Sequence, residues 1–285
     1  MTGPRRNLGD PESLLACPHC RGPLLRERQA LTCGDCEEVY PDAESGQRDL
    51  RLRKPKDCHV EVRLGGDLGE GLAFDFRRPS PPAGRLAPTL AEHIPPAPGP
   101  GAWALDLGCG DLLHRGMLLD KGYGYLGMDV SHPRAPILAD AHALPIVEDA
   151  VDIVLFMNVL EHLQHPLVAV REIARALKPG GMLLGSVAFL EPFHGRSLYH
   201  HSHLGTYNTL VAAGLQPLMI GPNVGWTVFK ALPRMGRLPR AASLLVRMAG
   251  LAWSLADRLQ PRADRRLRTC GSVAFRARKP MPGEP

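Results

Sequence analysis

The alternation of hydrophobic and polar positions divides the chain at about residue 102. Beyond this point, short apolar runs alternate with segments whose apolar residues recur at helical spacing. This alternation is typical of a parallel sheet with helices on both faces, so it predicts an α/β fold. The runs that predict strands are 103–107, 124–129, 151–157, 181–189, one within 216–230, and 272–278.

The clearest helix signal follows His165. Pro166 suits the first position of a helix, because the N–H that proline lacks is not needed there. Apolar residues then recur at helical spacing from Leu167 to Leu177. A Pro-Gly-Gly run at 179–181 is predicted to end this helix.

The first hundred residues are organised differently. Residues 14–50 are assigned to a small cysteine-containing domain. Residues 51–101 are irregular and rich in proline, with one short helix predicted between Gly84 and Ile94. The α/β domain is assigned to residues 102–280, with a helical insertion at about 231–268.

Four of the seven cysteines form two pairs, Cys17-Pro-His-Cys20 and Cys33-Gly-Asp-Cys36. Two such turns can place four thiolates around one Zn²⁺, which then stabilises a segment too short for its own core. Two disulfides or a reduced redox pair are the alternatives. We favour zinc, because no N-terminal secretory signal is recognised. Four cysteines close the coordination sphere, so this zinc is predicted to be structural.

A glycine-rich turn follows the first strand of the α/β domain. The strand contains Asp106 near its end, and the turn Gly108-Cys109-Gly110 leaves the backbone accessible to a ligand. Open parallel sheets bind nucleotides at such strand ends. Asp129 ends the next strand, at about the spacing expected for a carboxylate that binds a ribose. Together these residues predict a cofactor that contains adenosine.

Five ordered motifs extend this signal over roughly residues 84–280. They are Leu105-Asp-Leu-Gly-Cys-Gly110, Asp129, Ala139-Asp140-Ala141 with Leu144-Pro145, Asp152-Ile-Val-Leu-Phe-Met-Asn158 with Leu160-Glu-His-Leu163, and Leu177-Lys-Pro-Gly-Gly181. Together they resemble class I S-adenosylmethionine-dependent methyltransferases of the type 11 group. The resemblance implies a Rossmann-like sheet and methyl transfer from S-adenosylmethionine.

The resemblance also implies roles for individual residues. Asp106, Gly108, Cys109 and Gly110 would approach the methionine moiety, Asp129 the ribose hydroxyls, Asp140 and Ala141 the adenine, and Asn158 the methyl sulfonium. A sulfonium cofactor has no pyrophosphate, so its site needs carboxylates and backbone carbonyls more than a phosphate-binding helix terminus. Leu112 departs from the pattern, because many members of the group have a third glycine at this position.

Residues 14–50 resemble the small zinc-binding activator of tRNA methyltransferases, which also occurs fused ahead of methyltransferase domains. The resemblance rests on the four cysteines, Tyr40-Pro41 and Asp49-Leu50. It implies that this zinc ribbon contacts a protein partner or the substrate.

The acceptor pocket is expected in residues 191–203, directly after the predicted strand 181–189. This segment contains four histidines. If the acceptor is a hydroxyl or a carbon acid, one of them could be a general base, and His194 is the first choice. The alternative is a polar lid whose histidines only orient the substrate or solvate the site.

A long helix is predicted over residues 241–259, where Ala, Leu, Val, Met and Trp predominate. Residues 230–268 contain ten Lys or Arg and only two Asp, although the whole chain has a net charge of only +5. Such a helix could lie in a membrane interface as a peripheral contact. The simpler interpretation is a lid or dimer helix buried against the domain.

Three functions remain open at this stage. The first is a methyltransferase for a small-molecule or lipid-linked acceptor, which the apolar and basic helix favours. The second is an RNA base methyltransferase that uses the zinc ribbon as an RNA contact, although the ribbon is not strongly basic. The third is a non-catalytic cofactor-binding scaffold. We expect a cytoplasmic location, with membrane contact only at the surface, because neither a signal peptide nor a spanning helix is recognised.

Overall fold

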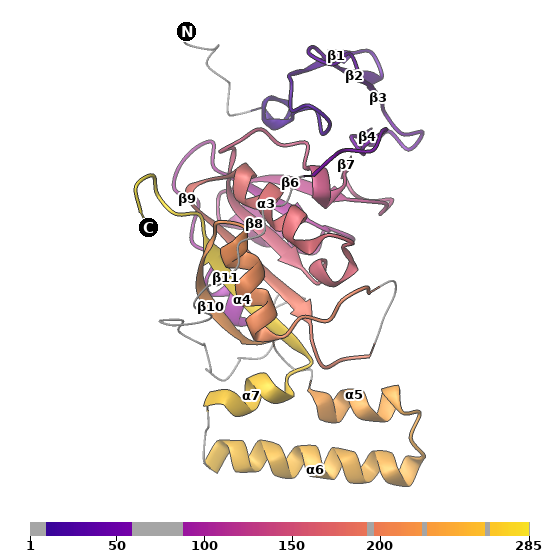
Figure 1. The fold of residues 1–285 in the computed structure, drawn as a ribbon, viewed down its shortest axis with the longest axis vertical. Helices are drawn as coiled ribbons and strands as arrows, with labels where there is room; N and C mark the ends of the chain where they lie inside the picture. Colours follow the sequence, from indigo (N-terminus) through magenta and orange to yellow (C-terminus); the bar gives the residue numbers. More distant parts are fainter. Residues whose placement is uncertain (1–9, 59–87, 193–196, 224–226, 260–262, 285) are drawn as a thin grey trace.

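The computed structural model describes residues 10–58, 88–192, 197–223, 227–259 and 263–284. Its centre is a sheet of eight strands in the order β10-β11-β9-β8-β5-β6-β7-β4 (Figure 1). The strands are β4 (Arg48–Asp49), β5 (Trp103–Leu107), β6 (Gly124–Asp129), β7 (Ile137–Leu138), β8 (Val151–Met157), β9 (Leu177–Ala188), β10 (Gln216–Pro222) and β11 (Ser272–Arg278). β11 is antiparallel to both of its neighbours, and the other paired strands are parallel. The predicted Rossmann-like α/β fold is therefore confirmed.

Helices cover both faces of this sheet. They are α1 (Pro88–Ala91), α2 (Arg115–Asp120), α3 (Pro166–Ala176) and α4 (His203–Ala212). Val154 and Phe156 of β8 belong to the hydrophobic cluster that includes α3 and α4. Ile153 and Leu155 belong to the cluster that includes α1 and α2. Successive side chains of a strand point to opposite faces, so β8 contributes to both hydrophobic layers.

The boundary between α3 and β9 lies earlier than the sequence predicts. α3 ends at Ala176, and β9 already begins at Leu177, which pairs with Val151 of β8. The register of β9 against β8 shifts after this pair, and Gly180 has a φ of 78°. Leu177 continues the apolar spacing of the helix, but its backbone is held by the neighbouring strand. Pairing with β8 therefore overrides the local periodicity.

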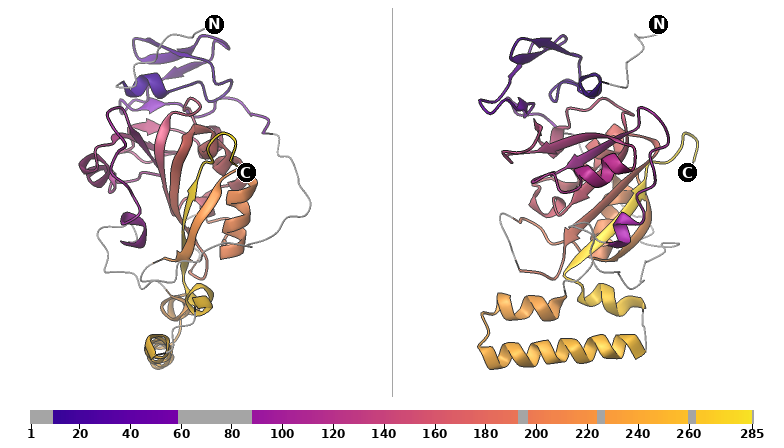
Figure 2. Two further views of the ribbon diagram at one scale, coloured as in Figure 1. Left: turned by 90° about the vertical axis from the view of Figure 1, so that its left-hand side faces the viewer. Right: turned by 180° about the vertical axis from the view of Figure 1, so that it is seen from behind.

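The cysteine-containing segment forms a small antiparallel sheet of its own. It consists of β1 (Leu24–Glu27), β2 (Ala30–Cys33) and β3 (Val39–Pro41), preceded by the 3-10 helix η1 (Pro11–Leu14). The next strand, β4, is not part of this small sheet. It pairs in parallel with β7 and forms the edge of the large sheet. Figure 2 shows this ribbon, coloured indigo, seated on one end of the α/β domain.

Hydrophobic packing reinforces the junction between the ribbon and the α/β domain. Leu14 and Leu50 are fully buried, and they belong to the same hydrophobic cluster as Val170 of α3. The amide of Val147 also donates a hydrogen bond to the carbonyl oxygen of Leu14, at 2.9 Å. The ribbon therefore shares the core of the α/β domain.

Three further helices lie between β10 and β11. They are α5 (Val228–Met235), α6 (Arg240–Leu259) and α7 (Ala263–Thr269). In Figure 1, α5 and α7 lie next to the sheet, and α6 lies beyond them at the far end of the molecule. Most described side chains of α6 are exposed, and Leu251 and Leu259 are 73% and 75% exposed. The interpretation that this helix is buried against the domain is therefore wrong.

The length and composition of the helices also bear on the membrane question. Among the described residues, no helix combines the length and the apolar character that a membrane crossing requires. Contact with a membrane surface is a separate matter, which depends on how the side chains of α6 are distributed.

Replacing Leu50 with alanine should test the shared core. Leu50 is fully buried at the junction, so Leu50→Ala should lower the free energy of unfolding by about 2–5 kcal/mol. Leu25→Ala is the matched control, because Leu25 belongs to the ribbon but is 56% exposed, and its effect should stay within about 0.5 kcal/mol. Urea denaturation measures both. Equal effects of the two substitutions would show that the ribbon does not share the core.

Candidate cofactor cleft and metal site

A cleft of about 520 Å³ opens at the carboxyl ends of β5, β6 and β8. Of the predicted cofactor residues, it brings together Gly108, Asp129, Asp140, Ala141 and Asn158. The remaining three, Asp106, Cys109 and Gly110, are not among the residues that line it. A larger cavity of about 920 Å³ lies between α5 and α6, and it contains none of the predicted cofactor residues.

Asp129 lies at the end of β6 with a carboxylate that is held in place by backbone amides. The amides of Ser131 and His132 donate to its Oδ1, each at 3.0 Å, and the amide of Gly110 donates to its Oδ2 at 3.3 Å. An ionised carboxylate offers about four lone-pair positions, so acceptor capacity remains for a ligand. The arrangement can hold a diol in the cleft.

Gly108 needs to be glycine for two reasons. Its φ is 77°, which is the left-handed region that side chains disfavour. A Cβ atom at this position would also lie only 2.2 Å from Cγ2 of Val159, which lines the same cleft. The loop thus places the backbone of Gly108 close to Val159, and both residues line the cleft that a ligand would occupy.

A chain of hydrogen bonds fixes the wall of the cleft around Asp140. The backbone amide of His165 donates to Nε2 of His142 at 3.1 Å, so this nitrogen carries no proton. Nδ1 of His142 therefore carries the proton, and it donates to Oδ1 of Asp140 at 2.6 Å. The same oxygen accepts from the His142 amide and caps the 3-10 helix η2 (Ala141–Ala143). The hydrogen bond from the His142 side chain holds the pKa of Asp140 below its usual value.

Asn158 follows β8 in a backbone conformation that few residues adopt. Its φ is 54°, and asparagine is one of the residues that tolerate this region. Its amide donates to the carbonyl oxygen of Ser186 at 2.9 Å, and its Oδ1 accepts from the Ser186 hydroxyl. Ser186 is buried in β9, so two strands fix the position of Asn158 at the mouth of the cleft. Conformations of this kind gather at functional sites.

Asp106 is buried beneath the glycine-rich turn. The hydroxyl of Tyr125 donates to its Oδ2 at 2.9 Å, and Nδ1 of His114 lies 3.4 Å from its Oδ1. Burial and the charge of Asp106 together raise the pKa of Tyr125, so this hydroxyl stays protonated as a donor. Asp106 is therefore held by residues of the next strand and of the segment before α2, and the sequence offered no signal for Tyr125 as its partner.

The departure at Leu112 does not disturb the turn. Leu112 adopts a φ of 61°, the left-handed conformation that a glycine there would adopt easily. Its side chain packs against a small cluster of buried residues that includes Cys109 and Leu138. Burial and the neighbouring carboxylates raise the pKa of Cys109 to about 12, so its thiol is protonated near neutral pH.

The segment expected to build the acceptor pocket is described only in part. His194, the predicted general base, lies outside the described residues. Leu198 lines the cleft, and its amide donates to the carbonyl oxygen of Glu161 at 2.7 Å. His201 is not a cleft residue, and burial, with a smaller effect of His200, lowers its pKa.

Several residues of the cleft wall were missed by sequence reasoning. They are Leu107, Val130, Ala139, His142, Met157, Val159, His162, Leu163, Gln164 and Leu198. A signal was available for most of them. Five belong to the quoted motifs, namely Leu107, Ala139, Met157, His162 and Leu163. His142 directly follows the Asp140-Ala141 motif, and Leu198 lies in the segment 191–203 that was expected to build the acceptor pocket. Val130, Val159 and Gln164 reach the cleft through turns of the backbone, which local patterns do not reveal.

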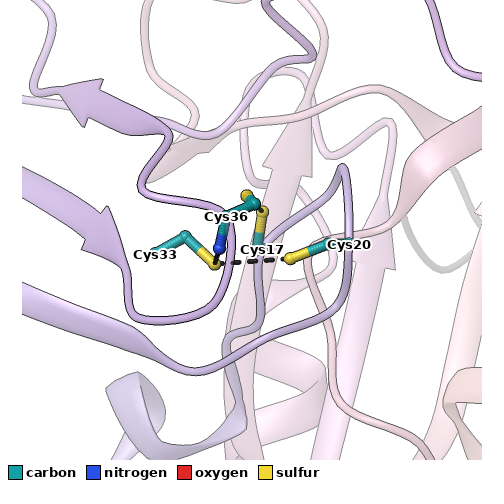
Figure 3. A group of neighbouring side chains, drawn as sticks. All are labelled: Cys17, Cys20, Cys33 and Cys36. Carbon is teal, nitrogen blue, oxygen red and sulfur yellow. Dashed lines mark hydrogen bonds between the residues drawn. The ribbon is translucent and has the colours of Figure 1, made fainter.

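The four cysteines of the ribbon converge from two loops (Figure 3). Their sulfur atoms all lie within 4.8 Å of one another, with 3.7 Å between Cys17 and Cys36 and 3.4 Å between Cys20 and Cys33. A tetrahedral site with Zn–S bonds of about 2.3 Å requires S···S separations of about 3.8 Å. The donor set therefore fits one structural zinc ion, because four thiolates leave no open coordination position.

Tyr40 supports this cluster from the buried side. Its hydroxyl lies 3.3 Å from Sγ of Cys17, and the tyrosine is almost fully buried. Burial opposes ionisation of Cys17, but hydrogen bonds, first of all that from Tyr40, outweigh it and lower its pKa to about 7. The amide of Gly22 also donates to Sγ of Cys20 at 3.3 Å. Donors directed at sulfur are what thiolate ligands require.

Removing the Tyr40 hydroxyl should weaken metal binding without removing a ligand. Hydrogen-bond partners of metal ligands typically contribute 10- to 100-fold to affinity, so Tyr40→Phe should lower zinc affinity by at least about tenfold. Tyr207→Phe is the matched control, because Tyr207 lies in α4. Competition with a chromophoric chelator measures both affinities. An unchanged affinity in Tyr40→Phe would show that the hydroxyl does not stabilise a thiolate.

Comparison with solved structures returned chains with this general fold. An S-adenosylmethionine-dependent methyltransferase from Mesorhizobium loti aligns with a TM-score of 0.44 and 18% identity, over 67% of this chain and 96% of that chain. A complex that contains the Haloferax volcanii Trm112 methyltransferase activator aligns with a TM-score of 0.48 and 20% identity, over 67% of this chain and 87% of the matched chain.

Comparison with protein families and with known sequences is more specific. Residues 105–185 match the family described as a methyltransferase domain, and residues 13–41 match the family described as Trm112p-like protein. Uncharacterized methyltransferases of Mycobacterium bovis and Mycobacterium leprae are each 34% identical, over 130 and 123 residues. These alignments cover 41% and 38% of this chain, and 50% and 46% of the two relatives, so the chain spans about half of their length. The chain therefore contains a methyltransferase domain, matched over residues 105–185, and ahead of it a Trm112p-like ribbon, matched over residues 13–41.

Proposed function

We propose that this protein transfers the methyl group of S-adenosylmethionine to a small-molecule or lipid-linked acceptor. The observation that carries the proposal is the cleft at the strand ends, where the fixed Asp129 carboxylate faces the same space as Gly108 and Asn158. These groups suit a sulfonium nucleoside, which has diol hydroxyls and a positive charge but no phosphate. The matched methyltransferase domain supports the same cofactor.

Different residues of the cleft would contact different parts of this cofactor. Asp129 would accept from the ribose hydroxyls, and the wall formed by Asp140 and Ala141 would lie against the adenine. Gly108 offers bare backbone for the methionine moiety, while Asp106 is buried and does not line the cleft. When bound, the cofactor supplies an electrophilic methyl group. The protein then has to align the acceptor with this methyl group and exclude water.

The walls around Asn158 are suited to excluding water. Met157, Leu163 and Leu198 line the same cleft as Asn158 with apolar side chains. Oδ1 of Asn158 accepts from the Ser186 hydroxyl. Its Nδ2 has no hydrogen-bond partner within the described parts of the chain, so its N–H groups are available to a ligand. They could orient an acceptor oxygen. His194 stays a prediction for the general base.

An RNA acceptor is the second candidate, and one feature favours it. A pocket of about 180 Å³ at the junction of the ribbon and the α/β domain is lined by Arg21, Lys56 and Arg171, and also by His142 of the cofactor cleft. Basic groups beside the cleft could bind phosphates. Arg21 is already paired with Glu172 at 2.7 Å, however, so part of this charge is neutralised. A protein partner of the ribbon and a non-catalytic scaffold are the remaining alternatives.

Cofactor binding should depend on the charge of Asp129. Asp129→Asn keeps the size of the side chain but removes an ionised acceptor, so the Kd for S-adenosylmethionine should rise by about tenfold or more. Asp111→Asn is the control, because Asp111 is close in the chain but does not line the cleft. Isothermal titration calorimetry measures both. Equal Kd values for the parent and Asp129→Asn would remove Asp129 from the site.

His142 should act on the cofactor through Asp140. In His142→Ala the pKa of Asp140 should rise towards its usual value, because the hydrogen bond that lowers it is lost. In the parent, the lowered pKa of Asp140 adds to the free energy of unfolding above the usual carboxyl pKa, and this addition is lost as the pH falls through the lowered pKa. His142→Ala should not show this loss of stability in acid. The Kd for S-adenosylmethionine should rise about fivefold, whereas His132→Ala, outside the cleft, should leave it unchanged. An NMR titration measures the pKa of Asp140 in both proteins. The same pKa in the parent and in His142→Ala would contradict this arrangement.

The acceptor class can be identified by incubating the protein with methyl-labelled cofactor and a fractionated cell extract. Label in the organic phase or in small molecules is the expected result, and Asp129→Asn should reduce it in proportion to cofactor binding. Label in RNA would establish the second candidate instead. Tight cofactor binding without transfer to any fraction would favour the scaffold.

A further inference from the structure

The outer side of α6 is a continuous apolar surface. Its large members are Leu244, Leu245, Met248, Leu251, Leu255 and Leu259, and all six are more than half exposed. At 3.6 residues per turn they cover an arc of about 120°, and the positions between them on this side are alanines. We call these six residues the outer face of α6. Monomeric proteins rarely expose such a patch unless it contacts something.

The orientation of α6 is set by its contact with α5. A Cβ atom at Gly250 would lie only 2.7 Å from Cβ of Phe229, so the two helices approach closely there. Trp253 lies on the same side of α6 as Gly250, and its ring is 5.9 Å from the ring of Phe229 in α5. The outer face is on the opposite side of the helix, so it points away from α5. The exposure of the six side chains thus follows from helix packing.

Positive charge borders this apolar surface. Arg240 and Arg247 are seven residues apart and lie along one edge of the outer face, next to Leu244 and Leu251. The segment 230–268 as a whole carries ten Lys or Arg and two Asp. A long amphipathic helix with basic residues along its apolar side is suited to the interface of an anionic bilayer, where arginine reaches the headgroups.

The helices also lie at the functional edge of the sheet. They connect the end of β10 with the start of β11, and Ser272 of β11 pairs with Ala188 at the carboxyl end of β9. The cofactor cleft opens at the carboxyl ends of β5, β6 and β8. Parallel strands end at one edge, so the insertion and the cleft share that edge.

We infer that the outer face of α6 binds the surface of an anionic lipid bilayer, with the six apolar side chains inserted below the headgroups and Arg240 and Arg247 at the phosphates. A second copy of the chain is a poorer occupant. Two such segments would repel each other, because each carries an excess of arginine. The inference concerns where the protein acts, and it does not require the acceptor to be a lipid.

Co-sedimentation with vesicles tests this inference directly. The full chain, without cofactor, should bind phosphatidylglycerol vesicles at least about tenfold more tightly than phosphatidylcholine vesicles. Because the measurement needs no methyl transfer, its failure is distinguishable from failure of the proposed activity. A chain that binds neither kind of vesicle would overturn the inference. Concentration-dependent dimerisation in sedimentation velocity, without vesicle binding, would assign the surface to a second copy.

Two sets of variants locate the contact. The triple variant Leu245→Gln, Leu251→Gln, Leu255→Gln should weaken binding to phosphatidylglycerol vesicles by more than about tenfold. The matched control changes three exposed leucines elsewhere, Leu25→Gln, Leu119→Gln and Leu204→Gln, and should bind as the parent does. Cofactor affinity and far-ultraviolet circular dichroism verify that both variants are folded. Equal loss in the two triple variants would show that the outer face is not the contact.

The arginines supply a second, independent readout. Each basic residue near an anionic surface contributes about 1 kcal/mol, which corresponds to about fivefold in affinity. Arg240→Gln and Arg247→Gln should therefore each weaken binding to phosphatidylglycerol vesicles about fivefold, and raised salt should reduce the difference. Arg26→Gln, in the ribbon, is the matched control. These polar substitutions keep the apolar face intact, so they remain informative if the leucine variant does not fold.

Discussion

The parallel pairing of β4 with β7 is the contact on which both the ribbon and the cofactor cleft depend. β7 is only two residues long, and the amide of Leu50 donates to the carbonyl oxygen of Leu138 at 2.9 Å just beyond the pair. The chain continues from Leu138 directly into Ala139 and Asp140, which line the cleft. The ribbon therefore supports, through the backbone, the wall that would hold the adenine. A metal ion bound by the four cysteines would contribute to the cleft by the same route.

Glu172 of α3 connects the same two parts through its side chain. One of its oxygens accepts from Arg21 of the ribbon at 2.7 Å, and the other accepts from the amide of Leu144 at 3.1 Å. Arg175 also donates to it, and these cations keep the pKa of the buried Glu172 low despite the opposing effect of burial. A buried carboxylate must find such partners. Here its partners come from the ribbon, from its own helix and from the loop that follows the Asp140 motif, so one charge holds three segments together.

The insertion between β10 and β11 is organised by different forces. The α/β domain and the ribbon bury their apolar side chains against each other. In contrast, α6 leaves the six apolar side chains of its outer face exposed, although its Trp253 packs against Phe229 of α5. The outer face of α6 gains no stability from the core of the protein. The insertion lies at the same edge of the sheet as the cleft, so a surface bound by α6 would lie at the edge where the cleft opens.

Local patterns in the sequence predicted the two candidate sites and the type of fold. The spacing of the four cysteines, the strands from Trp103 to Met157, and the acidic strand ends all follow from residues that are neighbours in the chain. The positions of His142, Ser186 and Leu198 depended on segments that are far apart in sequence. So did the burial of Asp106, because its partner Tyr125 belongs to the next strand.

Tertiary structure alone decided how the parts combine. Residues 14–50 were expected to be a ribbon stabilised by zinc because they are too short for a core of their own, and Leu14 and Leu50 join the core of the α/β domain. For residues 241–259 the sequence left open a helix at a membrane surface and a helix buried against the domain, and packing against α5 leaves their apolar side exposed. The physical reason is that sequence periodicity shows which side of an element is apolar. It does not show which surface covers that side, because this depends on contacts between segments that are distant in the chain.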